Sequence, residues 1–432
     1  MQVKTGKGTI SMMVVLAIWS LSLAVDLPGL AVTPIEGQLR SIFQDATDFK
    51  IQLLTVLPNL VIIPFVLLSG KLSESRHKIA VIAAGTILYI AAGALSIFSS
   101  SLNMLILLSC LLGAGCGLIL PFSTGLIADV FSGKYRMKQM GIISAIGNVA
   151  LVLATFVVGF LAAKSWHLPF LVYLLPLLSL ILIPFLRKIP QSDYDQPATD
   201  DSATSKSSSA TSGTTQTAAT VPAVDADGFS TKGQTVKGGF YVGRTVWLLL
   251  AYFFFVFATC IPCYYLPNFK WIDAESASTM TSVFYFAMFV VGLALTPCMK
   301  LFRKGTFIAA TAMIVGGFAL FVFTHSIVLY IIAAAICGLG NGIAQPIFYT
   351  KATEVVVSDS KSTLSLAYLQ VANYVAISLV PVIIGAARYI FGQPTSTLFP
   401  FVFVGIATAI VLVFVIIRSG RFVFGMSKNY YE

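Results

Sequence analysis

Long apolar segments separated by short polar connections recur along the whole chain. Most approach or exceed the roughly 20 residues with which an α-helix crosses the hydrocarbon core of a bilayer. They fall into two groups of six, at residues 10–32, 51–70, 79–99, 104–128, 139–163 and 168–186, and then at 245–267, 278–299, 306–325, 328–350, 364–387 and 398–417. The pattern predicts an all-α membrane protein with twelve transmembrane helices in two six-helix bundles.

The stretch between the two groups is polar. It is rich in Ser, Thr, Ala and Asp and contains too few large apolar residues to offset the entropy cost of ordering. We expect a disordered cytoplasmic linker that tethers the bundles, with regulation by a partner or by phosphorylation as the alternative. The expected domains are a cytoplasmic tail at 1–8, bundles at 9–186 and 244–418, the linker at 187–243, and a second cytoplasmic tail at 419–432.

Two of the predicted helices, one in each group, have the same pattern. The segment GAGCGLILPFSTGLIADVF (113–131) aligns with GLGNGIAQPIFYTKATEVV (338–356) at an offset of 225 residues, and the match continues downstream. The aligned pairs are Gly113 with Gly338, Gly115 with Gly340, Gly117 with Gly342, Pro121 with Pro346, Asp129 with Glu354, Arg136 with Lys361 and Asn148 with Asn373. Small residues four apart form a stripe on a helix, along which a second helix can pack closely. We infer a duplicated, pseudo-symmetric bundle rather than two helices alike only in composition.

Composition and charge agree with a membrane location. Hydrophobic residues make up 57% of the chain and charged residues only 10%, against about a quarter charged in soluble proteins. The net charge of +10 would suggest nucleic acid in a soluble chain, but most Lys and Arg residues fall in the connections on one side of the predicted bundle. Cytoplasmic loops of membrane proteins have this bias. We therefore expect a multi-pass protein of the inner or plasma membrane, with both termini cytoplasmic and no nucleic-acid partner.

The sequence contains no motif typical of an enzyme or of a cofactor site. The six cysteines lie within apolar segments, which favours free thiols over disulfides. Cys260 and Cys263 form a C-x-x-C pair, but no second pair or histidine lies near it in sequence. A phosphate-binding G-x-x-x-x-G-K-[ST] loop is absent, which argues against nucleotide hydrolysis. We expect no enzyme activity, no metal and no cofactor.

Several motifs resemble those of one transporter family. They are the G-x-G-x-G-x-x-x-P helix in both halves, the loop GKLSE (70–74) followed by basic residues, and WHLPF (166–170), which is similar to the W-R-x-x-F that commonly opens a sixth helix. Together with six plus six helices and a polar middle loop, they resemble the major facilitator superfamily over nearly the whole chain. The resemblance implies two halves that open a central site to one side of the membrane and then to the other.

The first helix looks like that of the twelve-helix drug:proton antiporters, because Asp26 precedes Leu27 and Pro28 ahead of a polar outer loop. Two features depart from the antiporter pattern. Ser109 stands where those proteins usually have an arginine, and residues 154–159 contain a single glycine in place of a Gly-Pro and paired glycines. Export by antiport is the preferred interpretation, with proton-linked uptake of a nutrient and a non-transporting receptor or scaffold on the same fold as alternatives.

Asp26 is the deepest acidic residue in any predicted span. An ionisable group within hydrocarbon needs hydration, a partner or a proton. We expect Asp26 to bind the coupling proton, or a cationic substrate that competes with the proton. The alternative is a carboxylate near the outer end that faces water or a neighbouring hydroxyl.

A second set of residues lies at the cytoplasmic ends of the helices. By the family resemblance, opposite charges there hold the two halves together and separate during turnover. The alternative is that these charges only anchor the topology. The candidate gating residues are Gly70, Glu74, Lys78, Asp129, Arg136, Glu354 and Lys361.

Neutral polar residues within the spans are candidates for substrate contact. Asn148 and Asn373 occupy equivalent positions in the fifth and eleventh helices, where a buried amide hydrogen-bonds across helices, the role we favour, or lines a cavity. The resemblance places the first, fourth, seventh and tenth helices around the central cavity. This adds Ser22, Asn341, Gln345, Tyr252 and Tyr264.

The surroundings of these residues indicate a class of substrate. No Lys or Arg lies deep in a span, although a carrier of phosphate or multi-carboxylates would need one. The interior is mostly apolar, whereas sugar carriers present many amides and hydroxyls. We expect a small amphipathic organic molecule, neutral or cationic, that a monomer in the lipid bilayer exports in exchange for protons.

Overall fold

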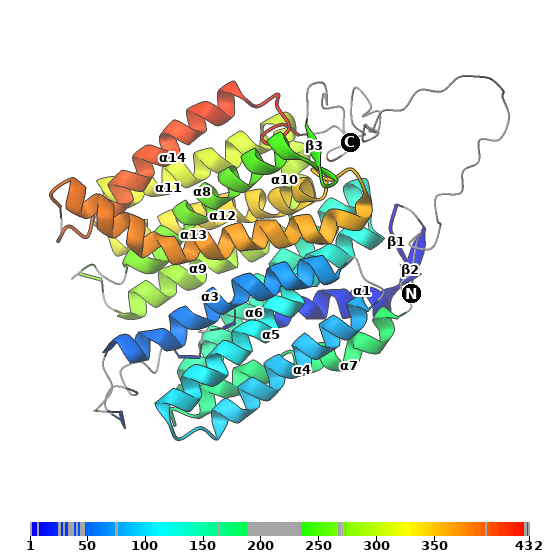
Figure 1. Cartoon of the computed structure of the whole chain (residues 1–432). Coiled ribbons are helices and arrows are strands. Elements are labelled where there is room, and N and C mark those ends of the chain that lie inside the picture. The colour runs from blue at the N-terminus through cyan, green and yellow to red at the C-terminus, as the bar shows by residue number, and fades with distance from the viewer. Residues whose placement is uncertain are drawn as a thin grey trace, which may run out of the picture.

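The computed structural model is a bundle of long helices that run roughly along one direction (Figure 1). The structure describes residues 2–6, 8–24, 27–28, 31–32, 39, 42–43, 48–73, 77–162, 164–187, 235–266, 269, 271–272, 274–393, 395–426 and 430. The first half contains α1 (Met12–Ser20) with a 3₁₀ extension (Leu21–Ala24), α3 (Asp48–Leu72), α4 (Lys78–Ile97), α5 (Leu102–Val130), α6 (Gly133–Ala162), a 3₁₀ segment (Leu168–Leu174) and α7 (Leu177–Leu186). The second half contains α8 (Val242–Tyr265), α9 (Ala274–Leu293), α10 (Leu295–Phe302), α11 (Thr306–Phe323), α12 (Ile327–Ala352), α13 (Ser362–Ile390) and α14 (Phe399–Ile417).

These helices confirm the predicted all-α membrane fold. Within the described residues, nine helices are long and apolar enough to cross a membrane, and three shorter apolar stretches at 12–24, 56–72 and 279–293 account for the other predicted spans. Two boundaries differ from the prediction. Helix α6 begins at Gly133 rather than at 139, because the helix continues beyond its apolar part. The helical part of the first segment ends at Ala24, ahead of Pro28, a residue that disfavours helix before it.

The glycine stripes pack in the same way in both halves. A methyl group at Gly113 would lie 2.5 Å from the carbonyl oxygen of Pro58 on α3, and one at Gly338 would overlap the carbonyl of Phe284 on α9. Gly115 and Gly340 fit equally closely against the next helix, α4 in the first half and α11 in the second. The inferred duplication is therefore present in the packing.

A short hairpin precedes the first helix of each half. Strands β1 (Gln2–Lys4) and β2 (Thr9–Ser11) form one, and β3 (Val236–Lys237) and β4 (Phe240–Tyr241) form the other. Each hairpin accepts a backbone hydrogen bond from the loop that follows the glycine-stripe helix of its half, α5 or α12. Ser132 N donates to Thr5 O at 3.0 Å, and Val357 N donates to Gly239 O at 2.9 Å. These two loop positions are again 225 residues apart. Hairpin strands therefore lie within the predicted first tail (1–8) and at the end of the predicted linker (187–243).

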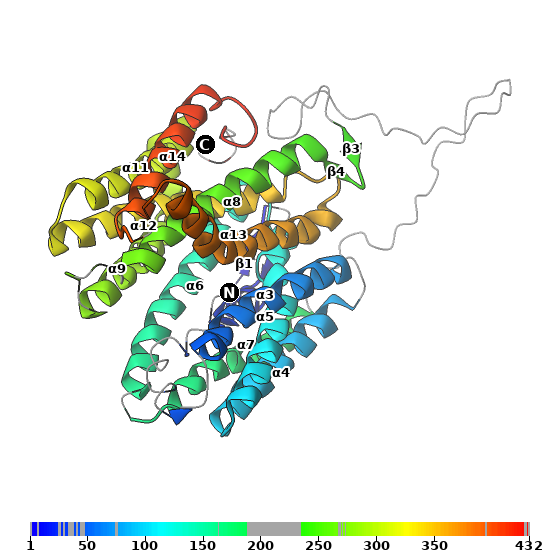
Figure 2. The ribbon, with the colours of Figure 1, turned by 60° about the vertical axis from the view of Figure 1, so that its left-hand side comes forward.

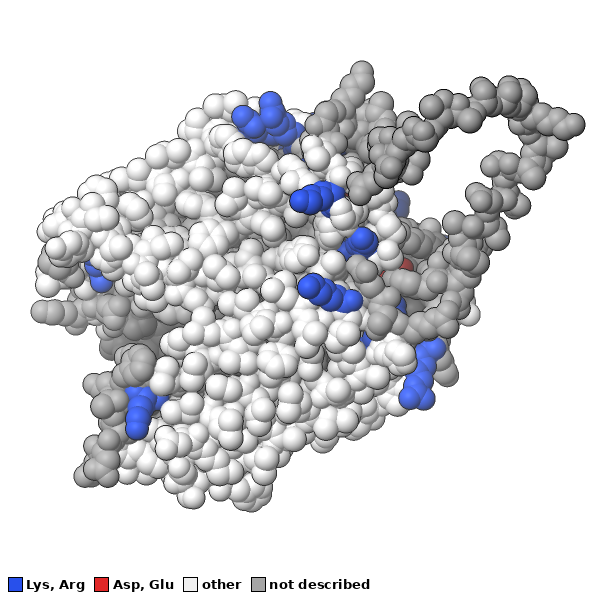
Figure 3. Space-filling model, in the orientation of Figure 1, with Lys and Arg blue, Asp and Glu red and all other residues white. Residues whose placement is uncertain are grey.

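The end of the bundle that contains both hairpins, the end of α7 and the start of α8 is called the linker end below. Both chain ends marked in Figure 1 lie there. Figure 3 shows a broad belt without charged side chains, with most Lys and Arg of this face at the linker end. The segment after α14 also folds back at this end, since Phe422, Val423 and Phe424 are buried, and the second tail is thus ordered in this part.

Candidate functional site

A hydrogen-bonded chain of neutral polar side chains crosses from the first half to the second. On α6, Asn148 Nδ2 donates to the backbone oxygen of Ser144 at 2.8 Å. Ser144 Oγ donates in turn to Gln345 Oε1 of α12 at 3.0 Å. The last contact joins the two halves, so each half contributes to one polar site.

The chain continues within the second half. Gln345 Nε2 donates to the hydroxyl of Tyr349, one turn further along α12, at 3.1 Å. The Tyr252 hydroxyl of α8 lies 3.4 Å from Tyr349 Oη and 3.4 Å from Asn373 Oδ1 of α13. Two contacts at that distance are weak hydrogen bonds, and a single hydroxyl proton cannot serve both fully. The two aligned asparagines therefore lie at opposite ends of one chain; the polar side chains from Asn148 to Asn373 are called the polar chain below.

The polar chain lies deep in the bundle. Ser144 is eleven residues from the start of α6, and Tyr252 is ten residues from the start of α8. At 1.5 Å per residue, both lie about 15 Å from the linker end, which is half of a hydrocarbon core of about 30 Å. Neutral groups from both halves thus meet near the expected midplane.

The cation nearest in sequence to the polar chain is directed toward the segment after α14. Lys351 follows Tyr349 on α12 and is fully buried, but its Nζ donates to the carbonyl oxygen of Phe422 in the segment after α14 and lies 4.7 Å from the Phe422 ring centroid. The described groups of the polar chain are all uncharged, so it is suited to ligands with few or no negative charges.

Three other residues predicted to contact substrate lie apart from the polar chain. Asn341 Nδ2 is directed at Met288 Sδ of α9, 3.5 Å away. Ser22 Oγ donates to the carbonyl of Trp19 in its own helix. Tyr264 is 44% exposed near the end of α8 remote from the linker end.

Two members of the polar chain were missed by the sequence reasoning, namely Ser144 and Tyr349. Helical spacing could have found both. Ser144 lies four residues before Asn148 and Tyr349 four residues after Gln345, so each shares a helix face with a residue that was selected.

Arg136 joins the two halves at the linker end. It is 9% exposed, and Nη1 donates to Thr353 Oγ1 after α12 at 2.8 Å. Its Nε and Nη2 donate to the carbonyls of Phe131 and Ala128 at 2.8 and 3.0 Å. The guanidinium thus satisfies carbonyls at the end of α5 while it bonds to the opposite half.

Lys78, Asp129, Glu354 and Lys361 each have a contact within their own half, whereas Gly70 packs against the opposite half. Lys78 Nζ of α4 lies 3.1 Å from Asp129 Oδ2 of α5, with both side chains less than one fifth exposed. Lys361 Nζ donates to Gly238 O of the second hairpin at 2.8 Å. Glu354 lies just after α12, where its N–H donates to Lys351 O. Asp26 and Glu74 lie outside the described residues, so their roles stay predictions.

Closely packed glycines also bring the halves together. A methyl group at Gly141 of α6 would lie 2.7 Å from the carbonyl oxygen of Gly292 on α9. One at Gly70 of α3 would lie 2.5 Å from Ala367 Cβ on α13, and Gly125 of α5 approaches Thr363 equally closely. These contacts lie toward the linker end, whereas Figure 2 shows the ribbons of the two halves diverging away from it.

Two six-helix halves, closed against each other at one end around a polar site from both, define the protein as a membrane carrier. The family model described as Major Facilitator Superfamily matches residues 9–381. The chain belongs to this superfamily and is a transporter rather than an enzyme.

Solved structures with the same fold cover nearly the whole chain. The proton:xylose symporter XylE, bound to 6-bromo-6-deoxy-D-glucose, aligns with a TM-score of 0.68 at 13% identity over 97% of this chain and 98% of its own. The transporter FucP in the outward conformation aligns with a TM-score of 0.65 at 15% identity over 94% and 98%. At these identities the similarity concerns the fold.

Curated relatives match over a shorter stretch. The quinolone resistance protein NorA of Staphylococcus aureus (strain MRSA252) is 32% identical over 114 residues, which is 26% of this chain and 29% of NorA. The multidrug transporter protein MdtP of Bacillus subtilis (strain 168) is 31% identical over 108 residues, 25% of this chain and 20% of MdtP. The aligned region therefore covers less than a third of the length of either relative.

Proposed function

We propose that this protein exports small amphipathic molecules, neutral or cationic, across the cell membrane in exchange for protons. The observation that carries the proposal is the polar chain, in which uncharged donors and acceptors from both halves meet near the midplane. Aromatic rings lie beside it: the Phe348 ring centroid is 5.1 Å from that of Tyr252. Such faces suit apolar and cationic ligands.

The position of the polar chain links binding to movement of the halves. Ser144 and Gln345 belong to opposite halves. A ligand that bonds to one of these side chains in place of the other therefore removes one contact between the halves. The bond is individually weak, with a net contribution of about 1 kcal/mol, and a ligand can replace it. Ligand binding then favours the arrangement in which the linker end opens.

The proton is assigned to Asp26. Its carboxyl group, within the first apolar segment, binds either a proton or a cationic ligand, and competition between the two produces exchange. The names of NorA and MdtP support export of drug-like molecules. The excess of Lys and Arg at the linker end (Figure 3) supports a cytoplasmic location for that end, and the presence of both half-sites in one chain supports a monomer.

The test compares two polar residues of α12 in cells that express the protein and are loaded with a fluorescent lipophilic cation. Cells with the unaltered protein should retain less dye than cells without it. Gln345→Leu should slow efflux about tenfold, whereas Asn341→Leu, one turn away and outside the polar chain, should slow it less than twofold. Equal effects of the two changes would contradict the role of the polar chain.

Direction and coupling need a second measurement. In everted vesicles, dye accumulation should require an imposed proton gradient and should fall to background in Asp26→Asn. Growth on an imported nutrient without dye efflux would indicate a symporter instead, and neither activity would indicate a receptor.

A further inference from the structure

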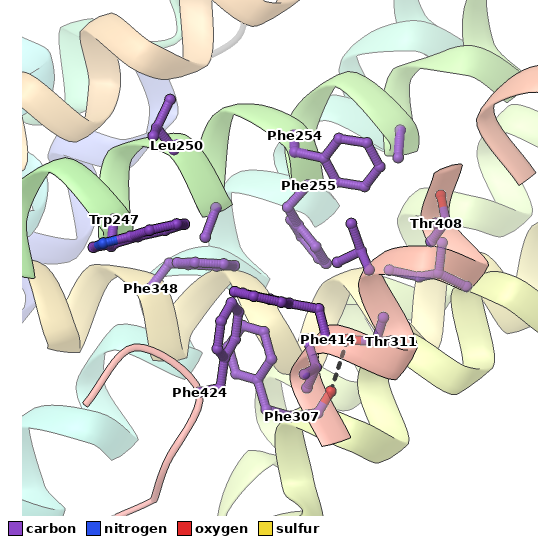
Figure 4. A pocket seen from close by; sticks show the side chains of 15 residues that line it. Trp247, Leu250, Phe254, Phe255, Phe307, Thr311, Phe348, Thr408, Phe414 and Phe424 are labelled. Atoms are coloured by element: carbon purple, nitrogen blue, oxygen red, sulfur yellow. Dashed lines mark hydrogen bonds between the residues drawn. The ribbon is translucent and has the colours of Figure 1, made fainter. Parts of the chain in front are cut away.

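A cavity separate from the polar chain lies inside the second half. It has a volume of about 260 Å³ and is surrounded by α8, α11 and α14, with Phe348 of α12 and Phe424 of the segment after α14 completing its wall (Figure 4). Trp247 and Leu250 on its rim are more than half exposed, and both lie on a helix apolar enough to cross the membrane. The cavity therefore opens toward the lipid.

The wall of the cavity is suited to hydrocarbon. Its side chains are aliphatic and aromatic, and their only polar atoms are the indole nitrogen of Trp247 and the hydroxyls of two threonines. Each threonine uses its hydroxyl proton within its own helix. Thr311 Oγ1 donates to Phe307 O at 2.8 Å, the bond drawn in Figure 4, and Thr408 Oγ1 donates to Val404 O at 2.7 Å. The indole nitrogen of Trp247 lies on the side remote from the other labelled rings. The wall thus presents no hydroxyl proton to a polar ligand.

The cavity is about as long as one leaflet is thick, and because its α8 wall extends on both sides of Tyr252, it reaches past the expected midplane. Along α8 its wall runs from Trp247, near the linker end, to Ala258. Eleven residues span about 16 Å of helix, and one leaflet contributes about 15 Å of the hydrocarbon core. An extended acyl chain that enters at the linker end would reach the bottom of the cavity. There it gains van der Waals contacts with close-packed walls that a fluid bilayer does not offer.

Positive charge lies beside the mouth at the linker end. Arg418 follows α14 directly, with its guanidinium carbon 5.1 Å from the centroid of the Phe414 ring that lines the cavity. Arg421 is exposed three residues before the lining residue Phe424. Neither arginine forms an ion pair within the part of the chain that the structure describes. A phosphate group at this depth would lie near the Arg418 guanidinium, and Arg421 follows three residues later on the same exposed segment.

We propose that this cavity binds one acyl chain of an anionic phospholipid from the leaflet at the linker end, with the phosphate held by Arg418 and Arg421. The site is distinct from the polar chain but shares a wall with it. Phe348 lines the cavity and packs on Tyr252. An acyl chain in the cavity stabilises this packing and the arrangement of the second half around it.

The test measures lipid binding by native mass spectrometry on the purified full-length protein, with dioleoyl phosphatidylglycerol and dioleoyl phosphatidylcholine as probes. We expect phosphatidylglycerol to bind more tightly. The charge variant Arg418→Gln with Arg421→Gln should remove most of this preference. Each arginine should contribute about fivefold to the affinity for phosphatidylglycerol. The matched control, Lys134→Gln with Lys138→Gln, removes two exposed charges of α6 at the same end and should leave it unchanged.

The acyl-chain part of the site is tested by filling the cavity. Thr408→Phe places a ring inside the cavity, whereas Ile410→Phe on the same helix points to lipid from a position that is 65% exposed. Phosphatidylglycerol binding should weaken at least tenfold in the first variant only. Ala258→Leu, a smaller filling of the same cavity, serves if Thr408→Phe does not fold. Equal phosphatidylglycerol binding by the filled and control variants would overturn the proposal. Displacement of the lipid by a fluorescent cation would also overturn it, because the cavity would then be a substrate site.

Discussion

The two stripe helices, α5 and α12, are alike where they pack and different where they end. Gly113 and Gly338 meet backbone carbonyls of α3 and α9, in corresponding places on either side of the 225-residue offset. The aligned bases downstream have separate roles: Arg136 bonds to Thr353 of the opposite half, and Lys361 bonds to Gly238 of its own. Duplication has preserved the close packing within each half, whereas the contact of the aligned bases is one-sided, because Arg136 bonds to the opposite half and Lys361 to its own.

This difference has a physical reason. Close approach of two helix backbones in a membrane requires small residues at the contact, so both copies need the same glycines. By contrast, one bond between the halves, such as that of Arg136 to Thr353, is enough to hold the linker end closed. The stripe glycines are thus expected to determine stability, and Arg136 the balance between open and closed states.

The largest effect is expected from a bulky residue on either stripe. Gly338→Leu and Gly113→Leu each force a side chain into a neighbouring backbone carbonyl, which costs about 3 kcal/mol or more. The midpoint of thermal unfolding should fall by about 3 °C or more for a chain of this length, measured by size-exclusion chromatography after heating. Gly316→Leu on α11, where nothing lies within 4 Å of the new Cβ, should have an unfolding midpoint within about 1 °C of the unaltered protein. Tolerance of one stripe substitution but not of the other would break the equivalence of the halves.

A smaller effect on stability, with a larger effect on the cycle, is expected from the glycine contact between the halves. Gly141→Leu would push against Gly292 of the second half and should open the linker end. Spin labels on Lys138 and Ser358, exposed residues of opposite halves at this end, would report a longer distance, and transport would fall about tenfold. Gly147→Leu on the same helix has open space around it and should leave the distance unchanged. A closed linker end in both variants would show that this contact does not limit the movement.

Much of the fold could be predicted from the sequence, because the bilayer imposes a simple length rule on apolar segments. The segments marked the part of each helix that lies in hydrocarbon, and the aligned glycines revealed the duplication. The hairpins were not predicted, since Gln2–Lys4 and Val236–Lys237 are short and polar. Their order comes from backbone bonds to the loops after α5 and α12, a tertiary contact without a local pattern.

The candidate site could be predicted only in part. Asn148 and Asn373 were selected as aligned buried amides, and Gln345 and Tyr252 because the family resemblance places their helices around the central cavity. The structure brings all four together. Asn341 was selected from the same resemblance yet is directed at Met288 of α9, because the helix that faces this side of α12 one turn before Gln345 is α9 rather than α6. The partner of Arg136 was not predictable, since Thr353 has no charge to mark it.

The smallest effect, and the sharpest test of the one-sided contact, is expected from the aligned bases. Arg136→Gln loses the bond to Thr353 and bonds to the carbonyls at the end of α5, all of them buried. If the loss disfavours the closed linker end by about 2 kcal/mol, the ratio of closed to open protein falls by about 30-fold. The spin-label distance between Lys138 and Ser358 should then show a substantial open population.

Lys361→Gln should behave differently, because its bond to Gly238 is exposed and lies within one half. We expect no measurable change in the closed fraction. Thr353→Val provides the matched control for Arg136: combined with Arg136→Gln it should add little, since both changes remove the same hydrogen bond. Equal opening by Arg136→Gln and Lys361→Gln would instead mean that the two halves contribute symmetrically to closure and that the one-sided contact has no part in gating.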